Sequence, residues 1–244
     1  MLDAVILAGG LGTRLRSVVS ELPKAMAPLG GKPFLEWVLR DLRRQGVQRV
    51  VLATGYKSSS IRSHFGACFE DLQLVYSEEQ APLGTGGALC AALDRVQTDA
   101  AFVLNGDTFL DVDLAAVEAR WRSSGNPVIV VREVADTQRY GCVVLDEHHV
   151  IRGFGEKTGS GPGYISGGCY CFPRDMLAAW RGRGAFSLES DFIVPALQAT
   201  RFEAWVAQGR FIDIGVPDDY ARALDVIQAP APVTPGHTPG AAPC

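Results

Sequence analysis

Apolar residues in the first half of the chain form short runs that alternate with stretches of helical spacing. Continuous apolar runs are typical of buried strands, whereas apolar positions three and four apart indicate one face of a helix. The expected strands are Ala4–Leu7, Arg49–Ala53, Leu72–Tyr76, Ala101–Leu104 and Val128–Val131. The expected helices are Leu35–Leu42, Ile61–Phe65, Thr85–Val96 and Leu114–Trp121. This alternation predicts an α/β fold with a parallel sheet covered by helices on both faces.

A different pattern begins after residue 135, where short β-like runs are separated by Gly and Pro. These runs, which predict an antiparallel or mixed subregion covering the site, are Gly141–Leu145, Val150–Phe154 and Gly168–Phe172. Further along the chain we expect helices near Arg174–Trp180 and Leu188–Leu197, a closing hairpin from Phe202–Val206 and Arg210–Ile214, and a final helix over Asp218–Ile227.

Composition supports one globular domain over residues 1–228, with halves that divide near residue 134. Residues 229–244 are mostly Ala, Pro, Gly and Thr, which bury too little apolar surface to offset ordering entropy, so we expect a flexible tail. The net charge of −4 does not favour a nucleic-acid binder. No leader and no apolar stretch of about 20 residues is found, so no membrane association is expected.

The six cysteines form no CxxC pair and have no His partner at zinc-ligand spacing. Reduced thiols in a cytoplasmic protein are the expected state.

A glycine-rich loop follows the first predicted strand and contains Gly9, Gly10 and Gly12. Glycines in this place let the backbone turn sharply and let amide N–H groups approach a phosphate chain. Arg14 and Lys24 add two cations at fixed offsets. The loop therefore predicts a phosphate-binding site just beyond a strand.

Two other phosphate-binding loops are excluded by the same sequence. The chain lacks the GxxxxGK[ST] pattern of a P-loop. The dinucleotide fingerprint GxGxxG fails because Leu15 stands where the third glycine is required, which argues against a nicotinamide-dependent oxidoreductase.

Three candidate site residues directly follow predicted strands, namely Gly9, Glu79 and Asp107. Ligands of open α/β sheets bind beyond the carboxyl ends of the strands. We therefore expect these residues along one edge of the sheet.

The pattern Gly9-Gly10-x-Gly12-Thr13-Arg14, followed by Pro23-Lys24, resembles the signature of the sugar-nucleotide pyrophosphorylases, nucleotidyltransferases that act on sugar 1-phosphates. The resemblance covers roughly residues 1 to 228 and extends to Pro82-Leu83-Gly84-Thr85-Gly86-Gly87, Asn105-Gly106-Asp107, Arg139-Tyr140-Gly141, Phe154-x-Glu156-Lys157 and Asp213-Ile214-Gly215-x-Pro217. Within this family, the segment Ser17–Lys24 and the compact length are most similar to the D-glycero-α-D-manno-heptose 1-phosphate guanylyltransferases.

The resemblance implies a Rossmann-like three-layer αβα sandwich with a mainly parallel central sheet and a small antiparallel sugar-binding subregion. It also implies the activity: an oxygen of a sugar 1-phosphate attacks the α-phosphorus of a nucleoside triphosphate, and pyrophosphate leaves. Mg²⁺ is the implied cofactor, because two anions must meet in the site. A homodimer is a further possibility that the resemblance raises.

The resemblance also carries site residues onto this chain. The residues expected to be catalytic are Arg14, Lys24 and Asp107, and the expected metal ligands are Asp107 and Asp213. Nucleotide binding is expected from Leu7, Ala8, Gly9, Gly10, Gly12, Thr13, Arg14, Glu79, Pro82, Gly84 and Thr85. Sugar-phosphate binding is expected from Tyr140, Gly141, Glu156, Lys157, Ser166, Gly167 and Glu189.

Two residues bear on specificity. The carboxylate of Glu79 can accept from both N1–H and N2–H₂ of guanine but would face an acceptor in adenine, a difference of about 1–3 kcal/mol, so GTP is expected. Ser166 stands where the family commonly has Asn, and its shorter side chain predicts a lost sugar contact or a bridging water.

Several alternatives stay open at this point. Mannose-1-phosphate guanylyltransferase and a pyrimidine-nucleotide transferase share the same loop. An inactive regulatory relative that senses sugar nucleotides should have lost a metal ligand or a loop cation. Here Arg14, Lys24, Asp107 and Asp213 are all present, which argues against an inactive protein.

Overall fold

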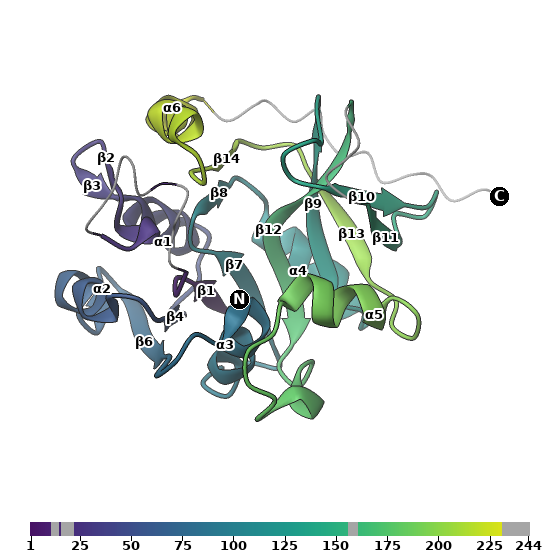
Figure 1. Ribbon diagram of the computed structural model, residues 1–244, viewed down its shortest axis with the longest axis horizontal. Coiled ribbons are helices and arrows are strands. Elements are labelled where there is room, and N and C mark those ends of the chain that lie inside the picture. The colour runs from purple at the N-terminus through teal and green to yellow at the C-terminus, as the bar shows by residue number, and fades with distance from the viewer. Residues whose placement is uncertain (11–14, 16–21, 156–160, 231–244) are drawn as a thin grey trace.

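Figure 1 shows the computed structural model, which describes residues 1–10, 15, 22–155 and 161–230. A ten-stranded sheet runs through the molecule, and two pairs of short strands stand beside it. The strands are β1 (Asp3–Leu7), β2 (Pro28–Leu29), β3 (Lys32–Pro33), β4 (Arg49–Thr54), β5 (Cys68–Phe69), β6 (Leu72–Glu78), β7 (Ala100–Asn105), β8 (Thr108–Leu110), β9 (Val128–Val134), β10 (Cys142–Leu145), β11 (Ile151–Gly155), β12 (Gly163–Pro173), β13 (Glu203–Ala207) and β14 (Phe211–Asp213).

The helices include six α-helices, two short 3₁₀ turns and one π-helix within the described ranges. The α-helices are α1 (Phe34–Arg44), α2 (Ser58–Phe65), α3 (Gly84–Leu93), α4 (Leu114–Ser124), α5 (Val194–Ala196) and α6 (Pro217–Gln228). The 3₁₀ turns are η2 (Lys24–Met26) and η3 (Ala178–Trp180), and the π-helix is η4 (Leu188–Ile193). In the same ranges, every helix is too short or too polar to traverse a lipid bilayer.

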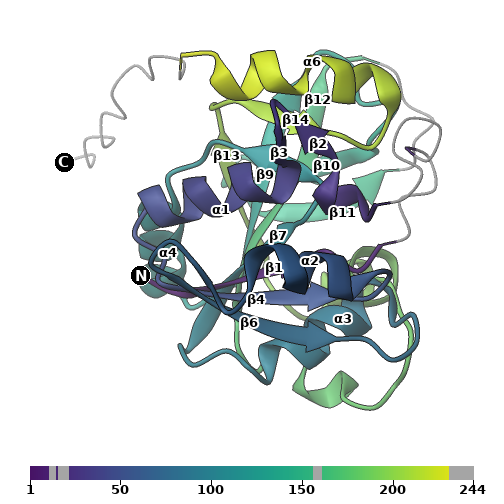
Figure 2. The ribbon, with the colours of Figure 1, turned by 90° about the vertical axis from the view of Figure 1, so that its left-hand side faces the viewer.

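Four parallel strands form the centre of the sheet in the order β7, β1, β4, β6. They coincide with four of the predicted strands, and α1 and α6 lie on one side of them while α3 lies on the other (Figure 2). Alternate side chains enter two separate cores: Ala4 and Ile6 of β1 face the α1 side, and Val5 faces the α3 side. The continuous apolar runs arise because both faces of these strands are buried. The predicted α/β sandwich is confirmed.

The second half of the chain continues this sheet with mixed strand directions. β12 pairs antiparallel with β7 on one side and with β9 on the other. β10 and β11 pair antiparallel beside the first part of β12, which confirms the antiparallel region expected after residue 135. The predicted strand Gly168–Phe172 is the second part of the longer β12.

The predicted closing hairpin from Phe202–Val206 and Arg210–Ile214 is wrong. β13 instead pairs parallel with β9, and β14 leaves the main sheet to pair antiparallel with β8. The chain between them passes so close to β8 that a Cβ on Gly209 would collide with the carbonyl oxygen of Asp111. Two neighbouring β-like runs suggest a hairpin, but here each run finds a partner that is distant in sequence.

The predicted helix Arg174–Trp180 is also wrong, because only the 3₁₀ turn η3 forms there. This stretch lies between Pro173 and two glycines in left-handed conformation, Gly182 and Gly184, which limit a helix at both ends. The helices expected near Leu188–Leu197 and Asp218–Ile227 are confirmed as η4 with α5, and as α6.

Replacing Gly209 by Ala is expected to lower the free energy of unfolding by about 1–3 kcal/mol, because the new methyl group meets backbone that has little freedom to move. For a chain of this length, each kcal/mol corresponds to roughly 2–4 °C in melting temperature. Urea unfolding measures the loss. Gly153→Ala is the matched control, since a Cβ at Gly153 meets nothing within 4 Å. Equal stability of the two variants would contradict the close approach.

Candidate functional site

The carboxyl ends of the central strands meet at one edge of the sheet. The amide of Gly106 donates to the carbonyl of Leu7 (2.9 Å), and the amide of Ala8 donates to the carbonyl of Ala53 (2.8 Å). The amide of Glu79 donates to the carbonyl of Thr54 (2.8 Å). The residues that follow β1, β4, β6 and β7 therefore lie together, as the sequence predicted for Gly9, Glu79 and Asp107.

Glu79 lies directly against the start of the glycine-rich loop. Its Oε1 occupies the place where a Cβ on Gly9 would stand, and Gly55 flanks the same carboxylate. Its Oε2 accepts a hydrogen bond from the amide of Leu83 (2.9 Å). This bond fixes the orientation of the carboxylate while leaving further acceptor positions on both oxygens.

A second cluster joins Lys24 to two aspartates. Lys24 Nζ lies 2.5 Å from Asp107 Oδ2 and 3.5 Å from Asp213 Oδ1. The antiparallel pairing of β8 with β14 places Asp213 opposite Thr108, and the amide of Ile214 donates to the carbonyl of Asp107 (3.0 Å). Two carboxylates that are distant in sequence are thus held around one ammonium group.

Burial and the neighbouring charge of Asp107 raise the pKa of Asp213 above its usual value. Lys24 and the amide of Gly215, which donates to Asp213 Oδ1 (2.7 Å), act in the opposite direction but do not cancel the rise. The cluster therefore holds more negative charge than one lysine neutralises. A divalent cation would relieve this repulsion.

The donor set at this cluster fits magnesium. Mg²⁺ is usually held by one or two carboxylates, with water and phosphate oxygens completing the shell. Asp107 and Asp213 supply two such carboxylates, and no group of three or more His, Cys, Asp or Glu converges elsewhere in the described residues. A site completed by substrate phosphates needs no third protein carboxylate.

The segment that contains Pro82, Gly84 and Thr85 contacts the chain around Phe186. Gly84 begins α3 with a positive φ of 66°, and Thr85 Oγ1 accepts from the amide of Leu188 (2.9 Å). The sequence predicted nucleotide contacts for these residues, and the structure additionally shows that they anchor residues 186–188.

Tyr140, which precedes Gly141, lies near Asp213. The ring of Tyr140 packs edge-on against Phe211, with 5.9 Å between ring centroids. Burial raises the pKa of the Tyr140 hydroxyl, and the carboxylates of Asp219 and Asp213 raise it further. The expected sugar segment is therefore adjacent to the expected metal ligands.

Ser166 and Gly167 form a bulge in β12 that reaches the end of β7. The bulge interrupts the register between Ser166 and Cys169, and a Cβ on Gly168 would stand 2.7 Å from Asn105 Nδ2. Ser166 Oγ lies 3.2 Å from the hydroxyl of Tyr170. Asn105 belongs to the motif that contains Asp107, but the sequence analysis assigned no separate role to it.

Tyr170 is a further residue that the sequence analysis missed. Burial raises the pKa of its hydroxyl to about 12, and the nearby carboxylate of Glu189 contributes to the rise. Tyr170 alternates with the buried Cys169 and Cys171 along β12, so it faces the opposite side of the strand. This alternation along the strand was the signal in the sequence that could have identified Tyr170.

Three more of the residues expected to bind the nucleotide are Leu7, Ala8 and Gly10. Leu7 ends β1, Ala8 is buried behind the loop, and Gly10 is exposed with open space around its Cα. The remaining expected residues lie outside the described part of the chain: Gly12, Thr13, Arg14, Glu156 and Lys157.

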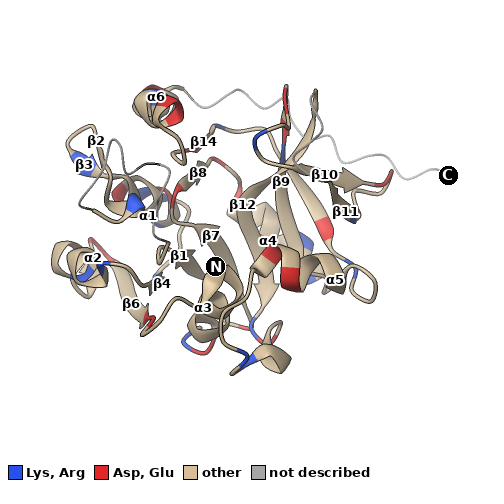
Figure 3. Ribbon diagram, in the orientation of Figure 1, with Lys and Arg blue, Asp and Glu red and all other residues tan. Residues whose placement is uncertain are grey.

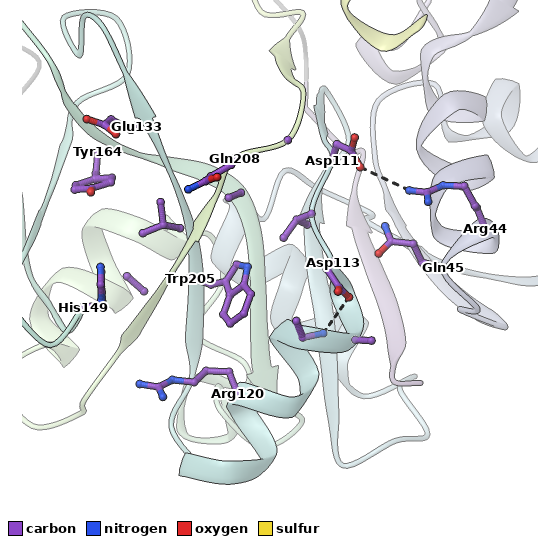
Figure 4. A pocket seen from close by; sticks show the side chains of 17 residues that line it. Arg44, Gln45, Asp111, Asp113, Arg120, Glu133, His149, Tyr164, Trp205 and Gln208 are labelled. Atoms are coloured by element: carbon purple, nitrogen blue, oxygen red, sulfur yellow. Dashed lines mark hydrogen bonds and ion pairs between the residues drawn. The ribbon is translucent and has the colours of Figure 1, made fainter. Parts of the chain in front are cut away.

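A large groove of about 1100 Å³ lies elsewhere, between α1, α4 and β13 (Figure 4). Several of its charged side chains have partners: Arg44 lies 3.6 Å from Asp111, and Arg120 lies 2.5 Å from Glu203. Asp113 caps α4. None of the expected site residues lines this groove, whereas Lys24, Asp107 and Asp213 converge at the sheet edge. We therefore place the candidate site at the sheet edge.

Charged residues are interspersed across the described part of the chain rather than gathered as one basic face (Figure 3). Local cations such as Lys24 must therefore provide the attraction for an anionic ligand.

Comparison with known proteins gives a consistent family. The family profile described as "Nucleotidyl transferase" matches residues 3–229. A D-glycero-alpha-D-manno-heptose 1-phosphate guanylyltransferase from Aneurinibacillus thermoaerophilus is 39% identical, with 93% of this chain and 99% of that protein covered. The protein of the same name from Campylobacter jejuni is also 39% identical, over 91% and 99% of the two chains. A mannose-1-phosphate guanylyltransferase from Mycobacterium tuberculosis is 35% identical over 96% of this chain and 68% of its own.

Solved structures agree with these relatives. HddC from Yersinia pseudotuberculosis is 36% identical and superposes with a TM-score of 0.84, covering 92% of this chain and 99% of that one. The same protein complexed with GMP-PN superposes with a TM-score of 0.83.

Replacing Asp213 by Asn is expected to raise stability near neutral pH in metal-free buffer. The raised pKa means that the folded protein disfavours the charged carboxylate, so the wild type loses stability as pH rises through that pKa. The uncharged amide avoids this loss, and a gain of about 1 kcal/mol would appear as roughly 2–4 °C.

Thermal unfolding at several pH values measures this effect, and the advantage should vanish at low pH, where Asp213 is protonated. The exposed Asp218, on the following helix, provides the control Asp218→Asn. A variant that is less stable than the wild type at neutral pH, but not at low pH, would contradict the proposed repulsion.

Proposed function

Because this chain belongs to the nucleotidyl transferase family, we propose that it transfers GMP from GTP to a sugar 1-phosphate, with D-glycero-α-D-manno-heptose 1-phosphate as the acceptor. The observation that carries the proposal is the convergence of Lys24, Asp107 and Asp213 at the sheet edge. Two relatives named for this activity match over nearly their whole length. The products would be GDP-heptose and pyrophosphate, so the enzyme would serve surface-polysaccharide synthesis.

Glu79 supports guanine as the base. Its carboxylate stands beside Gly9, at the start of the phosphate loop, where a nucleotide that follows the loop would present its base. The bond from the amide of Leu83 holds the carboxylate in place before the substrate arrives. A preorganised acceptor pair favours guanine by about 1–3 kcal/mol over a base that lacks the two donors. A 36% identical relative, HddC from Yersinia pseudotuberculosis, has been solved in complex with GMP-PN.

Charge neutralisation is the main task of the site, because the attacking and the attacked groups are both anions. Lys24 supplies one fixed cation, and a unit-charge pair at about 4 Å is worth roughly 4 kcal/mol at an effective dielectric of about 20. Asp107 and Asp213 would hold Mg²⁺, which when bound polarises phosphate oxygens and neutralises the leaving pyrophosphate. The remaining residues orient the two substrates for in-line attack.

Sugar recognition would involve Tyr140, Ser166 and Glu189. Tyr140 lies near Asp213, and Ser166 and Glu189 both approach Tyr170. The bulge that contains Ser166 lies against Asn105, at the end of β7 and two residues before Asp107.

The described cysteines are all free thiols, which supports the cytoplasmic location proposed from the sequence. The homodimer suggested by the resemblance stays a prediction.

A substrate panel tests the proposed function. We expect kcat/KM for GTP with heptose 1-phosphate to exceed the values for ATP, UTP, dTTP and for mannose 1-phosphate by at least about tenfold. Pyrophosphate release measures each pair. Glu79→Gln should lower kcat/KM for GTP about tenfold, because the amide presents a donor to a base edge that needs two acceptors.

Glu78→Gln is the matched control, since Glu78 pairs with Arg62 at 2.5 Å instead of facing the loop. A preference for UTP or dTTP would overturn the assignment of the base, and faster turnover of mannose 1-phosphate would overturn that of the sugar.

The metal requirement is tested separately. Chelation of divalent cations should abolish pyrophosphate release, and Asp107→Asn should lower kcat by roughly 100-fold or more at saturating Mg²⁺, because a neutral amide holds the cation weakly. Asp113→Asn is the control, since Asn caps a helix as well as Asp does. Near-normal turnover of Asp107→Asn would rule out its role as a metal ligand.

A further inference from the structure

The start of α3 packs closely against the chain around Phe186. The amide of Gly86 donates to the carbonyl of Phe186 (2.9 Å), and the amide of Phe186 donates to the carbonyl of Leu83 (3.0 Å). These two bonds join segments that are about a hundred positions apart in sequence.

Glycines make this approach possible. A Cβ on Gly84 would stand 2.5 Å from the carbonyl oxygen of Phe186, and one on Gly87 would stand 2.7 Å from the carbonyl oxygen of Gly184. A Cβ on Gly86 would collide with the ring of Phe186. The glycines after Leu83 therefore have a packing role that is separate from any contact with phosphate.

Thr85 adds a side-chain bond to the same junction. Its Oγ1 accepts from the amide of Leu188 (2.9 Å), which is the first residue of the π-helix η4. The next amides of that turn are capped locally: Ser187 Oγ accepts from Ser190 N, and the Asp191 carboxylate accepts from Ser187 N. The Leu188 amide thus adds a side-chain tie to the nucleotide half of the chain beside the two backbone bonds at Phe186.

Glu189 follows Leu188 directly and approaches the sugar side of the site. Its carboxylate is close enough to raise the pKa of the buried Tyr170 hydroxyl, which in turn lies 3.2 Å from Ser166 Oγ. A shift of the Leu188 backbone would therefore move Glu189 relative to Tyr170 and Ser166.

We propose that Thr85 is a positioning residue for the sugar 1-phosphate, acting through the backbone of Leu188 and Glu189 and not as a nucleotide ligand. The inference rests on the proposed function for the identity of the substrate. The Thr85 hydroxyl accepts from the amide of Leu188, which engages one of its two acceptor positions and orients the side chain toward η4. The two roles therefore predict different kinetic consequences.

The test compares Thr85→Val, which keeps the shape and removes the hydroxyl, with Thr85→Ser, which keeps the hydroxyl. We expect Thr85→Val to raise KM for the sugar 1-phosphate about fivefold to tenfold, which is the net effect of losing one hydrogen bond. KM for GTP should change less than about twofold, and Thr85→Ser should restore the wild-type KM for the sugar. The sugar 1-phosphate used is the one that the wild type turns over fastest in the substrate panel.

Amide hydrogen exchange gives a second readout that does not depend on catalysis. Protection at Leu188 and Glu189 should fall in Thr85→Val and return in Thr85→Ser, while protection in β1 and β4 stays unchanged.

A rise in KM for GTP with an unchanged KM for the sugar would overturn the proposal in favour of a nucleotide contact. Unchanged exchange at Leu188 in Thr85→Val would overturn it as well. If the wild type turned over no sugar 1-phosphate, the proposed function would fail. The proposal about Thr85 is then decided by hydrogen exchange. Equal protection at Leu188 and Glu189 in Thr85→Val and Thr85→Ser would overturn it.

Discussion

The pairing of β14 with β8 is the constraint on which the site depends. It brings Asp213 beside Asp107 and sets both carboxylates around Lys24, although the three residues come from separate parts of the sequence. Close carboxylates repel, and burial adds to the cost of their charge, as the raised pKa of Asp213 shows. The fold holds them together through backbone hydrogen bonds, which do not depend on the charge of either side chain.

The central sheet shows why local pattern was sufficient in the first half of the chain. β1, β4, β6 and β7 are buried on both faces, and burial on both faces leaves continuous apolar runs that are visible without a partner strand. The glycine loop, Glu79 and Asp107 could be placed for the same reason, since each follows such a run.

Sequence pattern was insufficient where partners are distant. β13 and β14 have the spacing of a hairpin, yet β13 pairs with β9 and β14 pairs with β8. The chain changes direction between them, where Gly209 passes close to Asp111. Likewise, nothing local to Thr85 indicates that its hydroxyl meets Leu188, because the contact spans two halves of the chain. Tyr170 was missed because its alternation with Cys169 and Cys171 shows which face of β12 it occupies but not which residues lie opposite that face.

The contact between Gly9 and Glu79 has a consequence for how such an enzyme can diversify. The carboxylate that would read the base occupies the volume that a side chain at position 9 would need, so the base reader and the phosphate cradle share one small space. A longer or differently shaped group at position 79 would press on the loop, and a larger residue at position 9 would displace the reader. A substitution that enlarges either residue therefore requires the other side of the contact to move, so the shape of the base-reading group and the path of the phosphate-binding backbone are mechanically linked.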